Sequence, residues 1–219
     1  MMISIILPVL NEPELPKFLA SLLEPLDGLN EMYEIIVVTG DRETKNTVVP
    51  SFTNVRHIVS YGDSLERAIL LGVSVSNGDK LLVMDADGSH PVTKVPDMIK
   101  ALDDVDLVVG SRFVVGSEFS STFFRRFVSD CFIIAARLVG SRLKDPMSGF
   151  FAFNKDLLIG TRFKPFTWKA CLELELKTKP TIQELPICFS KRNAGVSKTS
   201  MKIGLKLLGD LIEYQCRGY

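Results

Sequence analysis

With 219 residues, 46% of them hydrophobic and 24% charged, the chain has the composition of an ordinary globular protein with one large domain. Its 26 basic residues balance its 26 acidic ones, so the net charge gives no indication of a nucleic-acid partner. The apolar runs suit neither a signal peptide nor a membrane-spanning helix, and the four cysteines lack the spacing of a zinc site. We therefore expect reduced thiols and a cytoplasmic protein.

Short apolar runs and helical patterns alternate through the first half of the chain. Buried strands are predicted at residues 3–9, 33–38, 55–59, 80–84 and 107–110. Helices separate most of them, and the first helix is predicted to end at Pro25 and Gly28. This alternation predicts right-handed βαβ units in an α/β fold, with a mostly parallel twisted sheet flanked by helices.

Residues 113–140 differ in character, because phenylalanine and basic residues interleave there. A helix is predicted in this region, and its spacing places Ile134 and Leu138 in the core. The FFRR segment, which contains Arg125, suits an anionic membrane surface or an anionic group attached to a lipid. The region is therefore either a core helix rich in phenylalanine or an interfacial, acceptor-binding helix.

The next segment returns to strand and helix patterns. Residues 145–153 predict a turn followed by a strand, and residues 168–177 predict a helix. Lys169 and Glu173 are one helical turn apart, as in a solvated salt bridge. A proline interrupts the last predicted strand, at residues 182–189.

Residues 190–219 combine a basic loop with an amphipathic helix. The loop is either a flexible surface segment or a phosphate clamp, in which Arg192, Ser197 and Lys198 would bind phosphate oxygens. The helix would pack on the sheet, or lie on a membrane or a partner.

Polar residues follow several of the predicted strands. Asp85 and Asp87 occupy alternate positions at the end of one strand, so we expect both on the same side. Two neighbouring carboxylates repel each other unless a cation lies between them, and such oxygen ligands suit Mg²⁺ or Mn²⁺ carrying a diphosphate. Glu12, Asp41 and Arg112 follow other strands, and open sheets of this class bind ligands at those ends. We predict a metal and diphosphate site there.

Seven motifs together resemble those of one family: LPVLNE, VMDADGSHP, GSRF, FRRFVS, DPMSGFFAF, WKACLE and FSKRNAGVSK. In this order they are similar to the motifs of polyprenol-phosphate sugar transferases, typified by dolichol-phosphate mannosyltransferase. The resemblance spans roughly residues 3–205 and implies one catalytic domain, residues 1–219, with the GT-A fold of glycosyltransferase family 2. It implies inverting transfer of mannose or glucose from GDP-mannose or UDP-glucose to a polyprenyl or dolichyl phosphate, with Mg²⁺ or Mn²⁺.

The resemblance also implies roles for residues on the donor side. Pro8 and Glu12 would border the nucleotide. Asp85 and Asp87 would hold the metal or its diphosphate, and Ser89 matches a position that supplies a further ligand.

On the acceptor side, Arg112 and Arg125 match positions that bind the acceptor phosphate. Arg192, Ser197 and Lys198 match a loop that closes on the donor diphosphate. These implied roles would bring the two anionic substrates together.

The chemistry agrees with the implied roles. A lipid phosphate is largely ionised at neutral pH, since its second pKa is about 6 by analogy with phosphoryl side chains. The acceptor then needs no general base, and the leaving diphosphate requires a metal and arginines rather than a histidine pair. The chain has only two histidines, and we expect a structural or supporting role for His90.

The chain departs from the family pattern in several places. Thr39-Gly40-Asp41 stands where the family usually has Asp-Asp, which makes Asp41 the residue that would contact the nucleotide. Asp130 stands where the acceptor helix usually has a basic residue. Some relatives carry transmembrane helices after the catalytic domain. We expect this chain either to dock at the cytoplasmic face of a membrane, to use a membrane-anchoring partner, or to be the soluble part of a longer protein.

Three other hypotheses stay open. A transferase with a soluble sugar or protein acceptor would need a general base, for which Asp145 is the candidate. The change at Thr39 and Gly40 suggests a catalytically silent protein that binds nucleotide sugars. A phosphohydrolase with Asp85 as nucleophile is disfavoured, because such enzymes usually carry their DxD motif on the first strand.

Overall fold

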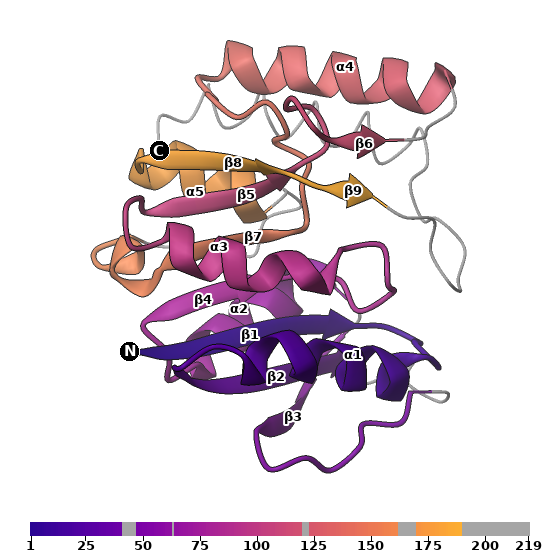
Figure 1. Ribbon diagram of the computed structural model, residues 1–219. Coiled ribbons are helices and arrows are strands. Elements are labelled where there is room, and N and C mark those ends of the chain that lie inside the picture. Colours follow the sequence, from indigo (N-terminus) through magenta and orange to yellow (C-terminus); the bar gives the residue numbers. More distant parts are fainter. Residues whose placement is uncertain (41–46, 63, 120–122, 162–169, 190–219) are drawn as a thin grey trace.

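The computed structural model describes residues 1–40, 47–62, 64–119, 123–161 and 170–189. Within them a seven-stranded sheet has the order β3-β2-β1-β4-β7-β5-β8, and β6 and β9 form a separate pair. Neighbours in the large sheet are parallel except where they involve β7, which is antiparallel to both β4 and β5. The predicted mostly parallel α/β sheet flanked by helices is therefore confirmed (Figure 1).

The strands lie close to the apolar runs that predicted them. The large sheet contains β1 (Met2–Val9), β2 (Met32–Gly40), β3 (Val55–Ser60), β4 (Lys80–Val83), β5 (Leu107–Ser111), β7 (Phe151–Asn154) and β8 (Ile182–Pro186). The two-stranded sheet pairs β6 (Glu118–Phe119) with β9 (Cys188–Phe189). Pro186 ends β8, and the chain then leaves the large sheet, so the predicted interruption of this strand is confirmed.

Helices cover both faces of the large sheet (Figure 1). One face carries α1 (Leu15–Asp27), the 3-10 turn η1 (Val92–Lys94) and α3 (Val95–Ala101). The other face carries α2 (Leu65–Val75) and α5 (Ala170–Thr178). β1 is buried between these layers, with Ile5 in the α1 layer and Ile6 in the α2 layer, which explains its continuous apolar run.

The α4 helix (Phe123–Leu138) lies past the β8 edge of the sheet in Figure 1. It packs on α5 through Phe132, Ala136 and Leu172. A second 3-10 turn, η2 (Lys155–Leu158), follows β7. Of the helices in the described part of the chain, none is long and apolar enough to cross a bilayer.

The expectation that Ile134 and Leu138 belong to the core is wrong. Their exposed fractions are 57% and 74%, whereas Phe132 and Ala136 are buried. The α4 helix has apolar residues on more than one face, so their spacing alone does not reveal which face packs.

The predicted end of α1 is confirmed at Gly28, which caps the helix, but is wrong at Pro25, because the helix continues through this proline to Asp27. Leu26, in the same last turn, is completely buried against the sheet. We infer that this packing offsets the backbone hydrogen bond that a proline cannot donate.

The expected pairing of Glu173 differs as well. Lys169 lies outside the described residues, and Glu173 instead accepts a hydrogen bond from Lys177 Nζ at 2.6 Å, one turn later. This pair is mostly buried rather than solvated. Burial raises the pKa of Glu173, and the Lys177 ammonium partly offsets that rise.

A buried carboxylate, that of Glu34, connects three strands. It accepts hydrogen bonds from Ser4 Oγ at 2.7 Å, from the Asn77 backbone N–H at 2.6 Å and from Arg56 Nη1 at 2.7 Å. The Gly78 N–H donates to the same Ser4 hydroxyl at 2.8 Å. Burial alone would raise the pKa of Glu34, but these donors more than compensate and its pKa is lowered.

Candidate active site

The predicted site residues gather at one end of the large sheet, the carboxyl edge, where its parallel strands have their carboxyl ends. β1, β4 and β5 all end at this edge because they run in the same direction, and Glu12, Asp85 and Arg112 follow their ends. Because β7 is antiparallel, the segment that leads into it, residues 145–150, lies at the same edge. Four segments that are distant in sequence therefore meet at the place where sheets of this class bind their ligands.

The two candidate metal carboxylates lie in a turn rather than on a strand. β4 ends at Val83, so the alternation along a strand that was expected to orient Asp85 and Asp87 does not apply, and that derivation is wrong. The turn itself orients Asp87, whose Oδ1 accepts the Ser89 backbone N–H at 3.0 Å and the Ser89 hydroxyl at 2.5 Å. Gly88, with φ of 76°, provides the left-handed residue of this turn.

His90 stabilises the same turn. The Asp85 backbone N–H donates to His90 Nδ1 at 3.0 Å, so in this arrangement a neutral ring carries its proton on Nε2. The ring is 4% exposed and stacks on Phe150 with centroids 5.2 Å apart. These contacts agree with the structural role expected for His90.

Arg112 is held by a buried carboxylate. Its Nε and Nη2 donate to the two oxygens of Asp145 at 2.8 and 2.7 Å, and its backbone N–H donates to Asp145 Oδ2 at 3.1 Å. The guanidinium carbon also lies 5.4 Å from the centre of the Phe113 ring. Asp145 is 0% exposed, so it is poorly suited to be the general base that a soluble acceptor would need.

Residues 145–150 connect the Asp85 turn to Arg112. At one end of this segment Asp145 binds the guanidinium. At the other end, a Cβ atom on Gly149 would lie only 3.4 Å from Asp85 Oδ2, and Phe150 stacks on His90. One short segment therefore contacts both halves of the candidate site.

Buried hydrogen bonds fix this connecting segment to β5. The Ser148 hydroxyl donates to the Gly110 carbonyl at 2.7 Å, and the Gly110 N–H donates to the Phe150 carbonyl at 2.8 Å. Gly110 has no room for a side chain, because a Cβ atom there would lie 2.7 Å from the Phe150 ring. The sheet therefore sets the distance between the Asp85 turn and Arg112.

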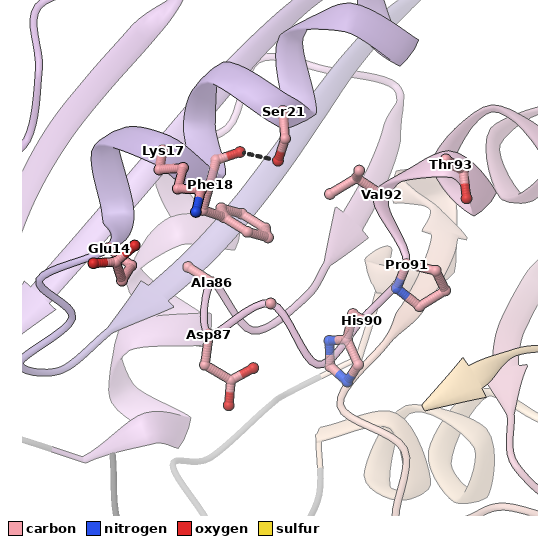
Figure 2. A pocket seen from close by; sticks show the side chains of 11 residues that line it. Glu14, Lys17, Phe18, Ser21, Ala86, Asp87, His90, Pro91, Val92 and Thr93 are labelled. Atoms are coloured by element: carbon pink, nitrogen blue, oxygen red, sulfur yellow. Dashed lines mark hydrogen bonds between the residues drawn. The ribbon is translucent and has the colours of Figure 1, made fainter. Parts of the chain in front are cut away.

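A pocket of about 300 Å³ opens beside Asp87 (Figure 2). Figure 2 shows Lys17 and Phe18 of α1 on one side and Asp87, His90 and Pro91 on the other. The pocket offers both an apolar ring and a carboxylate to a bound molecule. It lies where a ligand held at Asp87 would have space to extend.

The donor set suits a magnesium-like ion that brings its own phosphate ligands. Among the described residues, no three His, Cys, Asp or Glu side chains form a group that could hold a metal. Mg²⁺ usually keeps several waters and binds one or two carboxylates together with substrate phosphates. Asp85 and Asp87, both half-buried, fit that mode better than a site built from protein ligands alone.

The remaining donor-side residues lie at the ends of β1 and β2. Pro8 is buried in β1, and the Glu12 backbone N–H donates to Thr47 Oγ1 at 2.9 Å. Asp41 lies outside the described residues. Thr39, just before it, is buried and lies with Oγ1 2.9 Å from His57 Nε2.

Several predicted residues lie outside the described part of the chain. The side chain of Arg125 in α4 lies outside the described part of the chain, as do Arg192, Ser197 and Lys198 with the rest of residues 190–219. Their roles stay predictions.

Two carboxylates beside the site were not singled out in the sequence. Glu184 and Glu175 bind the segment that leads to Asp145. Glu184 accepts two backbone N–H groups, and Glu175 accepts one together with the Ser141 hydroxyl. Every sequence has such backbone groups, so no motif signals these carboxylates.

The chain is similar in sequence to known proteins. The sequence pattern of the family described as glycosyl transferase family 2 matches residues 4–160. A dolichol-phosphate mannosyltransferase of Pyrococcus furiosus is 32% identical over 214 residues, which cover 92% of this chain and 60% of that protein. A dolichol-phosphate mannosyltransferase of Saccharomyces cerevisiae is 33% identical over 172 residues, 73% of this chain and 64% of the relative.

The fold has solved counterparts. Glucosyl-3-phosphoglycerate synthase of Mycobacterium tuberculosis, crystallised with Mn²⁺, UDP-glucose and phosphoglyceric acid, superposes with a TM-score of 0.73 at 18% identity. The superposition covers 99% of this chain and 80% of that one. The chain thus spans less than two thirds of the two mannosyltransferases but nearly all of it follows the fold of a solved glycosyltransferase.

Proposed function

Because the chain belongs to glycosyl transferase family 2, we propose that it moves mannose or glucose from a nucleoside diphosphate sugar to a polyprenyl or dolichyl phosphate. The observation that carries this proposal is the 145–150 segment, which contacts both the Asp85 turn and Arg112. An enzyme that joins two phosphate-bearing substrates needs a cation site for one phosphate and an arginine for the other. The names of the two mannosyltransferase relatives support a lipid phosphate as acceptor.

The transfer needs no proton removal from the acceptor. One oxygen of the lipid phosphate forms a bond to the anomeric carbon of the sugar, while the bond from that carbon to the nucleoside diphosphate breaks. The diphosphate leaves with the electron pair, and the anomeric carbon is inverted. Since the second pKa of such a phosphate is about 6, the attacking oxygen is largely ionised at neutral pH. The burial of Asp145 is compatible with a reaction that uses no general base.

On the donor side, Asp85 and Asp87 hold Mg²⁺ or Mn²⁺ together with the diphosphate, and Ser89 orients Asp87 and stays a candidate ligand. When bound, the ion neutralises the charge that develops on the leaving diphosphate. Pro8 and Glu12 border the nucleotide. The Mn²⁺ and UDP-glucose in the crystallised neighbour support this assignment.

Asp41 contacts the nucleotide, since it stands where the family usually has Asp-Asp. Arg192, Ser197 and Lys198 close on the diphosphate, because a guanidinium and an ammonium neutralise phosphate oxygens. Negative charge develops on the leaving diphosphate during the reaction, so these contacts are strongest in the transition state.

On the acceptor side, Arg112 and Arg125 bind the lipid phosphate, and α4 lies at the cytoplasmic face of a membrane. The exposed Ile134 and Leu138, next to the exposed Arg137, suit an interface between apolar chains and anionic head groups. A membrane-anchoring partner that covers this face is the alternative. Flotation of the chain alone with vesicles containing anionic lipid distinguishes the two. If α4 binds the membrane directly, the chain floats with the vesicles and Ile134→Asp weakens that binding. If a partner is needed, the chain alone does not float.

A transfer assay tests the function itself. The chain is incubated with Mn²⁺, a short polyprenyl phosphate and radiolabelled GDP-mannose or UDP-glucose, and the label in the organic phase is counted. We expect labelled lipid with one of these donors. A folded chain that gives no labelled lipid with either donor, but labels a water-soluble acceptor, would overturn the proposal.

A further inference from the structure

Two carboxylates fix the chain segment just before the DPMSGF motif. Glu184 accepts the backbone N–H groups of Lys144 and Asp145, at 2.9 and 3.0 Å, one on each oxygen. Glu175 accepts the Arg142 N–H and the Ser141 hydroxyl, both at 2.5 Å. The backbone N–H groups of Arg142, Lys144 and Asp145 are thus oriented by charged acceptors, which bind more strongly than neutral ones.

This segment leads directly to Arg112. One of the two N–H groups that Glu184 accepts belongs to Asp145. The carboxylate of Asp145 in turn binds both the side chain and the backbone of Arg112. Glu184 lies on β8, beside the strand that carries Arg112, and pairs in register with Val109. The contacts form a closed path from β8 through Asp145 to the end of β5.

Three carboxylates surround this segment, and two of them have cationic partners: Arg112 binds Asp145, and Arg142 Nε lies 3.6 Å from Glu175 Oε1. Burial raises the pKa of the Cys171 thiol, and the charges of Glu175, Asp145 and Glu184 raise it further. Asp145 and Glu175 are buried and Glu184 is half-buried; buried charges are costly, and apolar replacements of similar volume are often equally stable. Carboxylates that fix the direction of a functional arginine through a second layer of contacts have a reason to be there.

We propose that Glu184 is a positioning residue for the acceptor phosphate, which acts by fixing Asp145 so that Asp145 orients the Arg112 guanidinium. This inference rests on the proposed function, because it assumes that Arg112 binds the lipid phosphate. Glu175 supports the same segment from α5 but contacts residues farther from Arg112.

The test compares Glu184→Gln with Gln183→Ala, a change of the exposed neighbour on the same strand. An amide oxygen accepts one of the two N–H groups, but an amide nitrogen cannot accept the other. We expect Glu184→Gln to raise the acceptor KM roughly tenfold, the effect of one lost hydrogen bond to a charged group. The donor KM should stay unchanged, and Gln183→Ala should change neither constant.

A double-mutant cycle with Arg112→Ala separates positioning from general destabilisation. If Glu184 acts through Arg112, Glu184→Gln causes no further rise of the acceptor KM in the Arg112→Ala background. Additive effects in that background, or equal rises of the donor and acceptor KM in the single variant, overturn the inference. Should Glu184→Gln fail to fold, Glu184→Asp keeps the charge and is measured in the same cycle.

The cycle also separates this inference from the function on which it rests. If Arg112→Ala leaves the acceptor KM unchanged, the proposed acceptor site fails. If Arg112→Ala raises the acceptor KM but Glu184→Gln and Glu184→Asp do not, only the positioning role fails.

Discussion

Ser89 directs both of its hydrogen-bond donors to a single carboxylate oxygen, Oδ1 of Asp87. Ser89 is 1% exposed, so these bonds form away from competing water. The contact orients the carboxylate that would face the donor diphosphate. Ser89, expected as a metal ligand, therefore also has a role in fixing the Asp87 side chain.

Ser89→Ala removes the hydroxyl bond to Asp87 but keeps the backbone N–H. We expect the Mn²⁺ concentration for half-maximal transfer to rise about tenfold, the usual loss when a partner of a ligand is removed. The measurement is a Mn²⁺ titration of transfer activity. The control Ser74→Ala removes an exposed hydroxyl on α2, and an equal Mn²⁺ requirement in both variants would contradict the orienting role.

Asp87→Asn replaces the carboxylate with a neutral side chain of the same shape. We expect transfer to fall about a hundredfold or more, because metal-ion stabilisation of developing charge is worth several kcal/mol. Calorimetry with the nucleoside diphosphate should show Mn²⁺-dependent binding in the parent chain and weak binding in the variant. Asp97→Asn, at an exposed site on α3, serves as the control. Undiminished Mn²⁺-dependent binding by Asp87→Asn would refute the metal role.

Asp145→Asn leaves the mostly buried Arg112 guanidinium without its charged partner. Loss of one member of such a pair is costly, so we expect the free energy of unfolding to fall by about 3 kcal/mol. Urea unfolding measures the change. Asp156→Asn changes an exposed carboxylate and should have little effect. If both variants lose the same stability, the Asp145 pair contributes nothing beyond a surface charge.

Glu34 stabilises the fold at neutral pH, and this contribution to the free energy of unfolding is lost in acid. Because its pKa is lowered on folding, its contribution is present above the unfolded value of about 4.3 and is lost as the pH falls through the lower folded value. At pH 7 we expect Glu34→Gln to lower the free energy of unfolding by about 1–3 kcal/mol, since buried donors lose a charged acceptor. The difference from the parent chain should narrow in acid. Denaturant unfolding from neutral to acidic pH, with the exposed Glu24→Gln as control, shows whether it does.

The sequence was sufficient to predict the sheet, because buried parallel strands require continuous apolar runs and β1 and β2 supply them. It was insufficient where packing overrides local preference. Pro25 by itself predicts a helix end, but Leu26 beside it is completely buried and the helix continues to Asp27. The exposure of Ile134 depends on which face of α4 meets α5, which spacing does not encode.

The sequence likewise predicts some residues of the candidate site and not others. Asp85, Asp87 and Arg112 could be found because parallel strands bring their following residues to one edge. The partners that orient them could not be found by that reasoning. Asp145 was considered only as a possible base, and its pairing with Arg112 depends on the path of the 145–150 segment. Glu184 contacts backbone groups and therefore leaves no pattern in the sequence.

The position of β7 between β4 and β5 has a consequence for charge neutralisation. Neighbouring strands are about 4.8 Å apart, so the strand leading to the Asp85 carboxylate and the strand leading to the Arg112 guanidinium are separated by roughly 10 Å. A gap of this size exceeds the screening length of about 8 Å for exposed charges at physiological ionic strength. It favours pairing of Arg112 with Asp145 over collapse onto the Asp85 turn. An intervening antiparallel strand thus keeps the Arg112 guanidinium away from the Asp85 turn, so that its ion pair is made with Asp145 and the carboxylates of the turn are left for a cation.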